Sequence, residues 1–224
     1  INWHLEPISN LVVPNKHWSQ IAFLDAAQAG DKKIIWELNR HSYFTTLGRA
    51  YWKTEDEFYA QVFVEHINSW IDANPPKLGI NWASSLEVAF RAISWLWALH
   101  FFRDSSHLTS QLFLRLLKSL YLHGRHLETY LSTYFSPNTH LTGEALGLFY
   151  LGTVLSDLRC ASRWQNLGLS ILLSQLNQQV RSDGVYFEQS SYYHRYTTDF
   201  YTHLLILLRE NDADIPPQIE EKLK

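Results

Sequence analysis

Residues that could move a proton beside a carboxyl group occur in two short motifs of this chain. The first runs from Asn138 through His140 to Glu144, and the second, from Asp183 to His194, contains Tyr193, 55 residues after Asn138. An asparagine amide can hold a carboxylate, while tyrosine and histidine can accept and return protons. We therefore predict one site built from both motifs, with Asn138, His140 and Tyr193 as its catalytic residues.

The residues between the two motifs have the apolar spacing of two helices. One helix is predicted over about 139–156 and the other over about 162–181, each roughly 25–30 Å long at 1.5 Å per residue. The short link at 157–161 makes them antiparallel. The chain should therefore return to the Asn138 end before it reaches Tyr193.

A second antiparallel pair of helices is predicted upstream, over 83–102 and 108–130. Three longer connections, 74–82, 131–138 and 182–191, are then expected at one end of the helix array. Binding groups often collect in loops on one rim of a rigid scaffold. In this interpretation Trp82 is a stacking platform for a sugar ring. The residues expected to contact substrate, in these connections and beside them, are Asn81, Trp82, Arg40, His41, Glu144, Glu188, His194 and Arg195.

The composition favours one all-α domain covering residues 1–224. The chain is 46% hydrophobic, lacks a Gly/Ser-rich linker, has almost no strand signal, and places its prolines at predicted element boundaries. Helical pairs in series predict an incomplete (α/α) toroid or barrel of antiparallel hairpins, or an α-solenoid.

The charge pattern argues against several classes of partner. The net charge is −3 and no Lys/Arg cluster is present, so nucleic acid is not an expected partner. No stretch reaches the ~20 apolar residues of a membrane span. The eleven histidines show no obvious set of three ligands, so we expect no metal, and we expect no cofactor.

The chain contains no methionine and opens on Ile1. We interpret it as a processed or trimmed piece of a longer protein, whose targeting signals cannot be read from this sequence.

At several spaced blocks the chain resembles the heparinase II/III family, whose members are lyases with an α/α toroid followed by an antiparallel β-sandwich. The resemblance lies in Trp36 to His41, in Ser69-Trp70 with Asn74-Pro75, in Gly79 to Arg91, and in the Asn138 and Asp183 motifs. Blocks in this order are more specific than any one of them.

The resemblance implies β-elimination in a uronic-acid polysaccharide, such as a heparin or heparan-like chain, alginate or a bacterial exopolysaccharide. Asn138, helped by His140, would contact the uronate carboxyl. Tyr193 would act as base and acid, although a tyrosine pKa near 10 requires a nearby cation or donor. Glu144, one helical turn from His140, could orient its imidazole.

The family also implies a C-terminal β-sandwich partner domain, which usually adds a further histidine to the site. No alternating strands follow Asn211, so the site in this chain is expected to be incomplete. A bacterial, periplasmic or secreted setting is implied by resemblance alone.

Ordinary alternatives remain for each residue. Asn138 is also placed to cap a helix, and His140 with Glu144 could be a surface pair. Tyr193 could bury its ring and bond its hydroxyl to a carbonyl. The block from Trp36 to His41 could be a buried polar network. The whole domain could be a glycoside hydrolase using Glu144 with Glu188 or Asp183, or a glycan-binding domain without catalysis.

Overall fold

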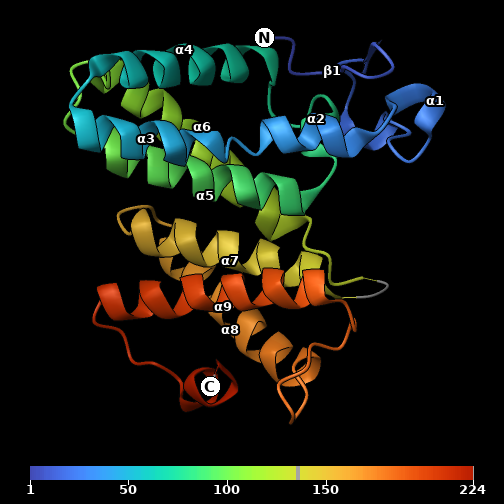
Figure 1. The fold of residues 1–224 in the computed structure, drawn as a ribbon, viewed down its shortest axis with the longest axis vertical. Coiled ribbons are helices and arrows are strands. Elements are labelled where there is room, and N and C mark those ends of the chain that lie inside the picture. The colour runs from blue at the N-terminus through green and yellow to red at the C-terminus, as the bar shows by residue number, and fades with distance from the viewer. Residues whose placement is uncertain (135–136, 224) are drawn as a thin grey trace. The chain divides into compact units, whose positions relative to one another are not determined.

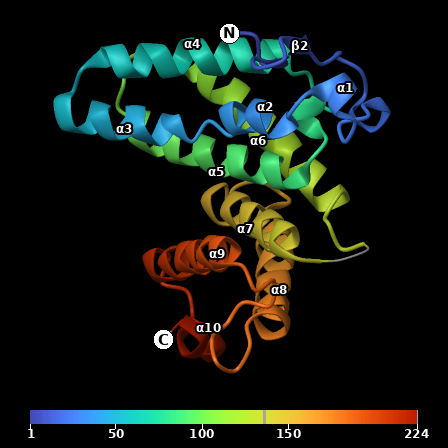
Figure 2. The same cartoon turned by 45° about the vertical axis from the view of Figure 1, so that its right-hand side comes forward.

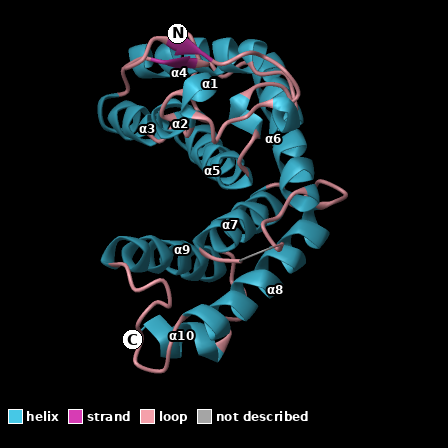
Figure 3. Cartoon of the chain, turned by 90° about the vertical axis from the view of Figure 1, so that its right-hand side faces the viewer, coloured by secondary structure: helices cyan, strands magenta, loops and turns pink. Residues whose placement is uncertain are grey.

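The computed structural model describes residues 1–134 and 137–223 and divides into two compact units, Ile1–Arg125 and His126–Lys224. Helices supply most of the regular structure in the described residues, which confirms the predicted all-α class (Figure 3). The strands described are a short antiparallel pair in the first unit, β1 (Leu5–Glu6) and β2 (Leu11–Val12).

The first unit consists of short helices followed by four longer ones. Its helical elements are η1 (Trp18–Gln20), α1 (Ala26–Ala29), α2 (Lys32–Asn39), α3 (Tyr43–Thr54), α4 (Glu57–Ala73), η2 (Ile80–Trp82), α5 (Ser85–Phe102) and α6 (Ser110–Thr129), whose last residues fall in the second unit.

Aspartates start three helices of this unit. Asp25, Asp31 and Asp56 each accept a hydrogen bond from the backbone N–H two residues later, which satisfies a donor that the helix itself leaves unpaired. Helix α3 packs against both α4 and α5, as Figures 1 and 2 show. Their shared core includes stacked rings of Phe63 and Phe102, with centroids 4.8 Å apart.

The second unit is built around a helix that is buried along most of its length. Its helices are α7 (Thr139–Val154), α8 (Ala161–Gln179), α9 (Ser191–Glu210) and α10 (Pro217–Leu223). All residues from Leu141 to Gly152 are buried. Close packing of α7 on α8 requires glycine, because a Cβ at Gly152 would lie 2.4 Å from the backbone nitrogen of Gln165.

Helices α7 and α9 lie side by side and run in the same direction (Figure 1). The hydroxyl of Tyr150, 11 residues beyond Thr139, bonds Nδ1 of His203, 12 residues beyond Ser191. Because the two helices run in the same direction, these nearly equal distances mean that both helices begin at the same end of this unit.

The predicted helical pairs are confirmed, with ends that differ by one or two residues. Helix α7 ends at Val154 instead of 156 because Leu155 leaves helical geometry, at φ −103° and ψ 49°. Helix α8 ends at Gln179 instead of 181 because Val180 is extended and forms a bridge to Tyr186.

Candidate active site

Asn138 is the N-cap of α7. Its Oδ1 accepts a hydrogen bond of 3.0 Å from the backbone N–H of His140. The cap predicted as an alternative is therefore present. It uses only the oxygen of the amide, and within residues 1–134 and 137–223 the Nδ2 group of Asn138 makes no hydrogen bond. The half-buried amide keeps two N–H donors for a ligand.

The two predicted motifs meet in the second unit. Glu188 Oε1 accepts hydrogen bonds from Thr139, at 3.1 Å from its backbone nitrogen and 2.5 Å from its Oγ1. The Tyr186 hydroxyl lies 2.8 Å from Thr139 Oγ1 and donates to Gln179 Oε1 at 3.0 Å. The predicted return of the chain from the end of α8 to the start of α7 is thus present in the structure.

Tyr193 lies in the first turn of α9 and is 44% exposed. Its neighbours His194 and Arg195 are also exposed. Nδ1 of His194 accepts a hydrogen bond of 3.4 Å from the backbone of Tyr186, and the Arg195 guanidinium lies over the Tyr192 ring at 5.4 Å. His140, in the first turn of α7, is exposed as well. The candidate proton carriers therefore remain accessible.

The hollow beside the start of α9 has a volume of about 370 Å³. Residues of α8, the connection 183–186, α9 and α10 line it, and among them are Tyr186, His194 and Lys222. Lys222 donates its ammonium to the carbonyl of Val180, so that cation is already engaged.

Glu144 does not orient His140. Its two carboxylate oxygens accept hydrogen bonds of 2.7 Å from the backbone N–H and the hydroxyl of Ser132. Glu144 is fully buried, and this burial raises the pKa of its carboxyl group to about 7, while the bonds from Ser132 act in the opposite sense. The residue holds the connection before α7 onto the helix, and it is withdrawn from solvent.

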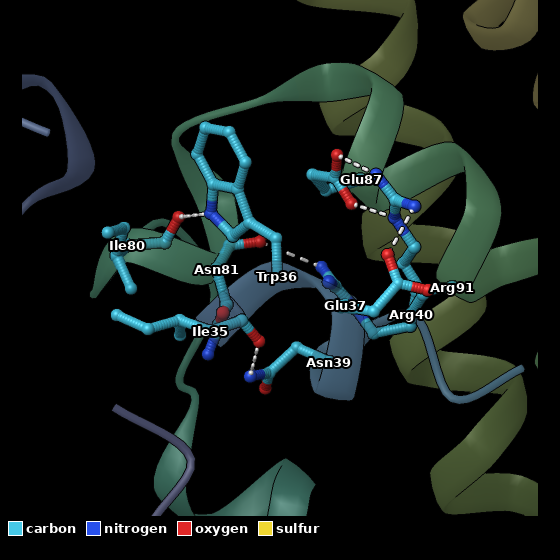
Figure 4. A network of polar contacts seen from close by, with 9 residues as sticks. All are labelled: Ile35, Trp36, Glu37, Asn39, Arg40, Ile80, Asn81, Glu87 and Arg91. Atoms are coloured by element: carbon cyan, nitrogen blue, oxygen red, sulfur yellow. Dashed lines mark hydrogen bonds and ion pairs between the residues drawn. The ribbon is translucent and has the colours of Figure 1, made fainter. Parts of the chain in front are cut away.

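Arg40, in the first unit, is committed to protein carboxylates. Its Nε and Nη2 donate to the two oxygens of Glu87 at 2.6 and 2.9 Å, and its Nη1 donates to Glu37 at 2.7 Å (Figure 4). The Glu87 side chain is 5% exposed and that of Arg40 is 20% exposed. This paired arrangement favours the predicted alternative of a structural polar network over the predicted substrate contact by Arg40.

His41 is fully buried, and the indole N–H of Trp95 donates to its Nδ1 at 2.9 Å. Burial, and next the charge of Arg91, lower the pKa of His41 well below its ordinary value. A neutral, buried imidazole cannot attract a substrate anion directly. The placement of His41 also favours the structural alternative.

Asn81 and Trp82 are buried in the same way. Asn81 Nδ2 donates to the carbonyl of Trp3 at 3.1 Å and to Asn74 Oδ1 at 2.8 Å. Trp82 is 1% exposed and packs against His123, with centroids 4.8 Å apart. A stacking platform needs an exposed ring face, so Trp82 is corrected to a core residue.

Arg91 is the centre of this network, which spacing alone did not reveal. The guanidinium is fully buried, donates to His123 Nε2 at 2.9 Å and to the carbonyl of Asn81 at 3.0 Å, and lies 4.4 Å from the Trp70 ring. Burial lowers the pKa of Arg91 to about 9, and the charge of Glu87 opposes this change. The side chain thus remains charged at neutral pH.

The part of the chain that the structure describes contains no group of three or more His, Cys, Asp or Glu side chains placed to hold a metal ion. No described helix combines the length and apolarity of a membrane span.

Comparison with known proteins identifies relatives with a named activity. A heparin-sulfate lyase of Bacteroides thetaiotaomicron is 30% identical over 193 residues, covering 84% of this chain and 27% of that protein. One of Pedobacter heparinus is 27% identical over 177 residues, covering 76% of this chain and 26% of that protein. The chain thus spans about a quarter of the length of these curated relatives.

Solved structures confirm the predicted α/α-toroid fold class. A heparinase III structure with methylated lysines matches with a TM-score of 0.72 at 26% identity, over 86% of this chain and 33% of the other. The crystal structure of a heparan sulfate lyase from Pedobacter heparinus matches with a TM-score of 0.77 at 22% identity, over 100% of this chain and 33% of the other.

The family described as the heparinase II/III N-terminus matches residues 1–223. This chain, homologous to heparin-sulfate lyases, therefore belongs to the heparinase II/III N-terminal family.

Proposed function

We propose that this chain is the helical domain of a lyase that cleaves a uronic-acid polysaccharide by β-elimination. Heparan sulfate is the first substrate to test, because the relatives are named as heparin-sulfate lyases. The observation that carries the proposal is the common starting end of α7 and α9, where Asn138 and Tyr193 lie in one unit.

The proposed reaction removes a proton and breaks one bond. Tyr193, as phenolate, takes the C5 proton of the uronate, the C5 electrons form a double bond to C4, and the C4–O bond breaks. The departing oxygen receives a proton from the tyrosine. Asn138 Nδ2 and His140 hold the carboxyl group on which negative charge develops, as donors do in an oxyanion hole.

Helix direction supports this assignment of charge. The N-termini of α7 and α9 carry partial positive charge, which favours the carboxylate of an acidic sugar near their first turns. His194 and Arg195 are the proposed further contacts to the acidic sugar, since both are exposed next to Tyr193. In the full-length protein we expect a β-sandwich domain to complete the site.

The hydrolase alternative loses support from the carboxylates it needs. Glu144 is fully buried and bonded to Ser132, and Glu188 is bonded to Thr139. A pair of glycosidase carboxylates must reach the scissile bond from both sides.

The test uses the full-length protein and follows the ultraviolet absorbance of a 4,5-unsaturated uronate on heparan sulfate, heparin and alginate. Tyr193→Phe should lower kcat by roughly 100- to 10,000-fold, because phenylalanine cannot carry a proton. Tyr192→Phe is the matched control, a neighbouring tyrosine that is 57% exposed. Equal activity of both variants would contradict the role of Tyr193. New reducing ends without absorbance would indicate a hydrolase, and binding without product would indicate a glycan-binding domain.

A further inference from the structure

Glu188, in the connection between α8 and α9, accepts hydrogen bonds from the first residue of α7. Its Oε1 accepts from the backbone nitrogen and the hydroxyl of Thr139, 49 residues earlier, and lies 3.2 Å from the Tyr186 hydroxyl oxygen. Both donors of Thr139 thus converge on one carboxylate oxygen. From this geometry, and resting on the proposed function, we propose that Glu188 is a positioning residue. It holds the side chains of Asn138 and Tyr193 in the relative positions that the elimination requires.

The bond to the Thr139 backbone fixes the start of α7. The first N–H groups of a helix have no partner inside the helix. The backbone N–H of Thr139 donates to Glu188 Oε1, and the backbone N–H of His140 donates to Asn138 Oδ1. A carboxylate at this point is also favoured by the helix dipole and makes a charge-assisted bond. Glu188 therefore stabilises the turn that orients the Asn138 amide.

The surroundings make this contact hard for water to replace. Thr139 is 3% exposed and Tyr186 is 2% exposed. Gln179 Oε1 accepts from the hydroxyls of Thr142 and Tyr186, and Gln179 Nε2 donates to Gln175. Burial raises the pKa of Tyr186 to about 12, so its hydroxyl keeps its proton and remains a donor at neutral pH.

Glu188 also fixes the approach to α9. It lies two residues before Ser190, whose side chain caps α9 by accepting from the backbone nitrogen of Tyr193 at 3.4 Å. The Glu188 side chain therefore connects the start of α7, capped by Asn138, with the segment that leads to Ser190, the cap of the helix that carries Tyr193. Misplacement of one reacting group by about 1 Å can cost ~100-fold in rate.

A positioning role and a substrate contact predict different kinetics. With the full-length protein, Glu188→Ala should lower kcat roughly 10- to 100-fold with little change in KM. Glu188→Gln should restore most of the loss, because its amide oxygen still accepts from Thr139. The charge-matched control, Glu210→Ala, removes an exposed acid at the far end of α9 and should leave both constants unchanged. A raised KM with unchanged kcat in Glu188→Ala, or no restoration by glutamine, would overturn the proposal.

A second measurement does not depend on turnover. Amide hydrogen exchange at Thr139 should accelerate in Glu188→Ala, while the amide of Leu148, in the interior of α7, serves as the internal reference. In an active protein, unchanged exchange at Thr139 would overturn the positioning role alone. A wild-type protein that eliminates no substrate would overturn the proposed function and, with it, the catalytic part of this inference.

A double-mutant cycle separates direct action from action through Thr139. Thr139→Ala removes the hydroxyl donor, and its combination with Glu188→Ala should cost less than the product of the two single losses, because both break one contact. Losses that multiply would show that Glu188 acts independently of Thr139, against the proposal.

Discussion

The side-chain oxygen of Asn138 accepts a hydrogen bond of 3.0 Å from the backbone N–H of His140, which turns the amide so that its nitrogen is left for a ligand. One residue thus has a helix-capping half, its amide oxygen, and a proposed binding half, its amide nitrogen. The capping half sets the direction in which the binding half points.

The two halves of Asn138 can be separated by substitution. Asn138→Asp keeps a capping oxygen, so its free energy of unfolding should stay within a few tenths of a kcal/mol, whereas Asn138→Ala should lose about 1 kcal/mol. Both variants lack the amide donor, and both should lose roughly 100-fold or more in kcat. Denaturant unfolding and the elimination assay, run on the same preparations, measure the two effects. An active Asn138→Asp enzyme would show that the nitrogen is not needed.

Glu144 should make stability depend on pH. Its pKa is raised from 4.5 to about 7 by burial, so the folded state holds a proton that the unfolded state releases. The contribution of Glu144 is fully present below about pH 4.5 and is lost as the pH rises through about 7. The shift in pKa between the unfolded and folded states corresponds to a contribution to the free energy of unfolding of at most about 3 kcal/mol.

Glu144→Gln removes this titration and keeps an acceptor for Ser132. Its midpoint of thermal unfolding should therefore fall less between pH 5 and pH 8 than that of the wild-type protein. Parallel pH profiles for the two proteins would mean that the carboxyl group titrates normally in the folded state.

The sequence predicted helices α7 and α8 well because their apolar spacing is long and regular and because Asn138 is a strong capping residue. It also predicted that the ends of the two motifs meet, since antiparallel helices of similar length bring the chain back. The contact that joins them, Glu188 to Thr139, could not be predicted, because it depends on how the connection at 180–190 folds.

Burial in the loops was the least predictable property. Trp82 follows a Gly79-Ile80-Asn81 segment that looks like an exposed connection, yet the segment forms η2 and its tryptophan enters the core beside Arg91. Glu144 was expected to pair with His140 by helical spacing, but the connection before α7 supplies Ser132 instead. Spacing along one helix does not reveal which neighbouring segment covers it.

The two carboxylates on Arg40 offer a final prediction with an internal control. Glu87 binds Arg40 through both oxygens with its side chain 5% exposed, whereas the Glu37 side chain is 66% exposed. Removing Glu87 takes away both hydrogen bonds on the buried side of the Arg40 guanidinium and leaves it only the exposed carboxylate of Glu37, so Glu87→Ala should lower the free energy of unfolding by roughly 3 kcal/mol. Glu37→Ala should change it by less than about 1 kcal/mol, because solvent already screens that pair. Urea unfolding of both variants at low and high salt measures the difference. Equal losses would mean that Glu87 is no more important to Arg40 than a surface carboxylate, and they would reopen a substrate-binding role for this arginine.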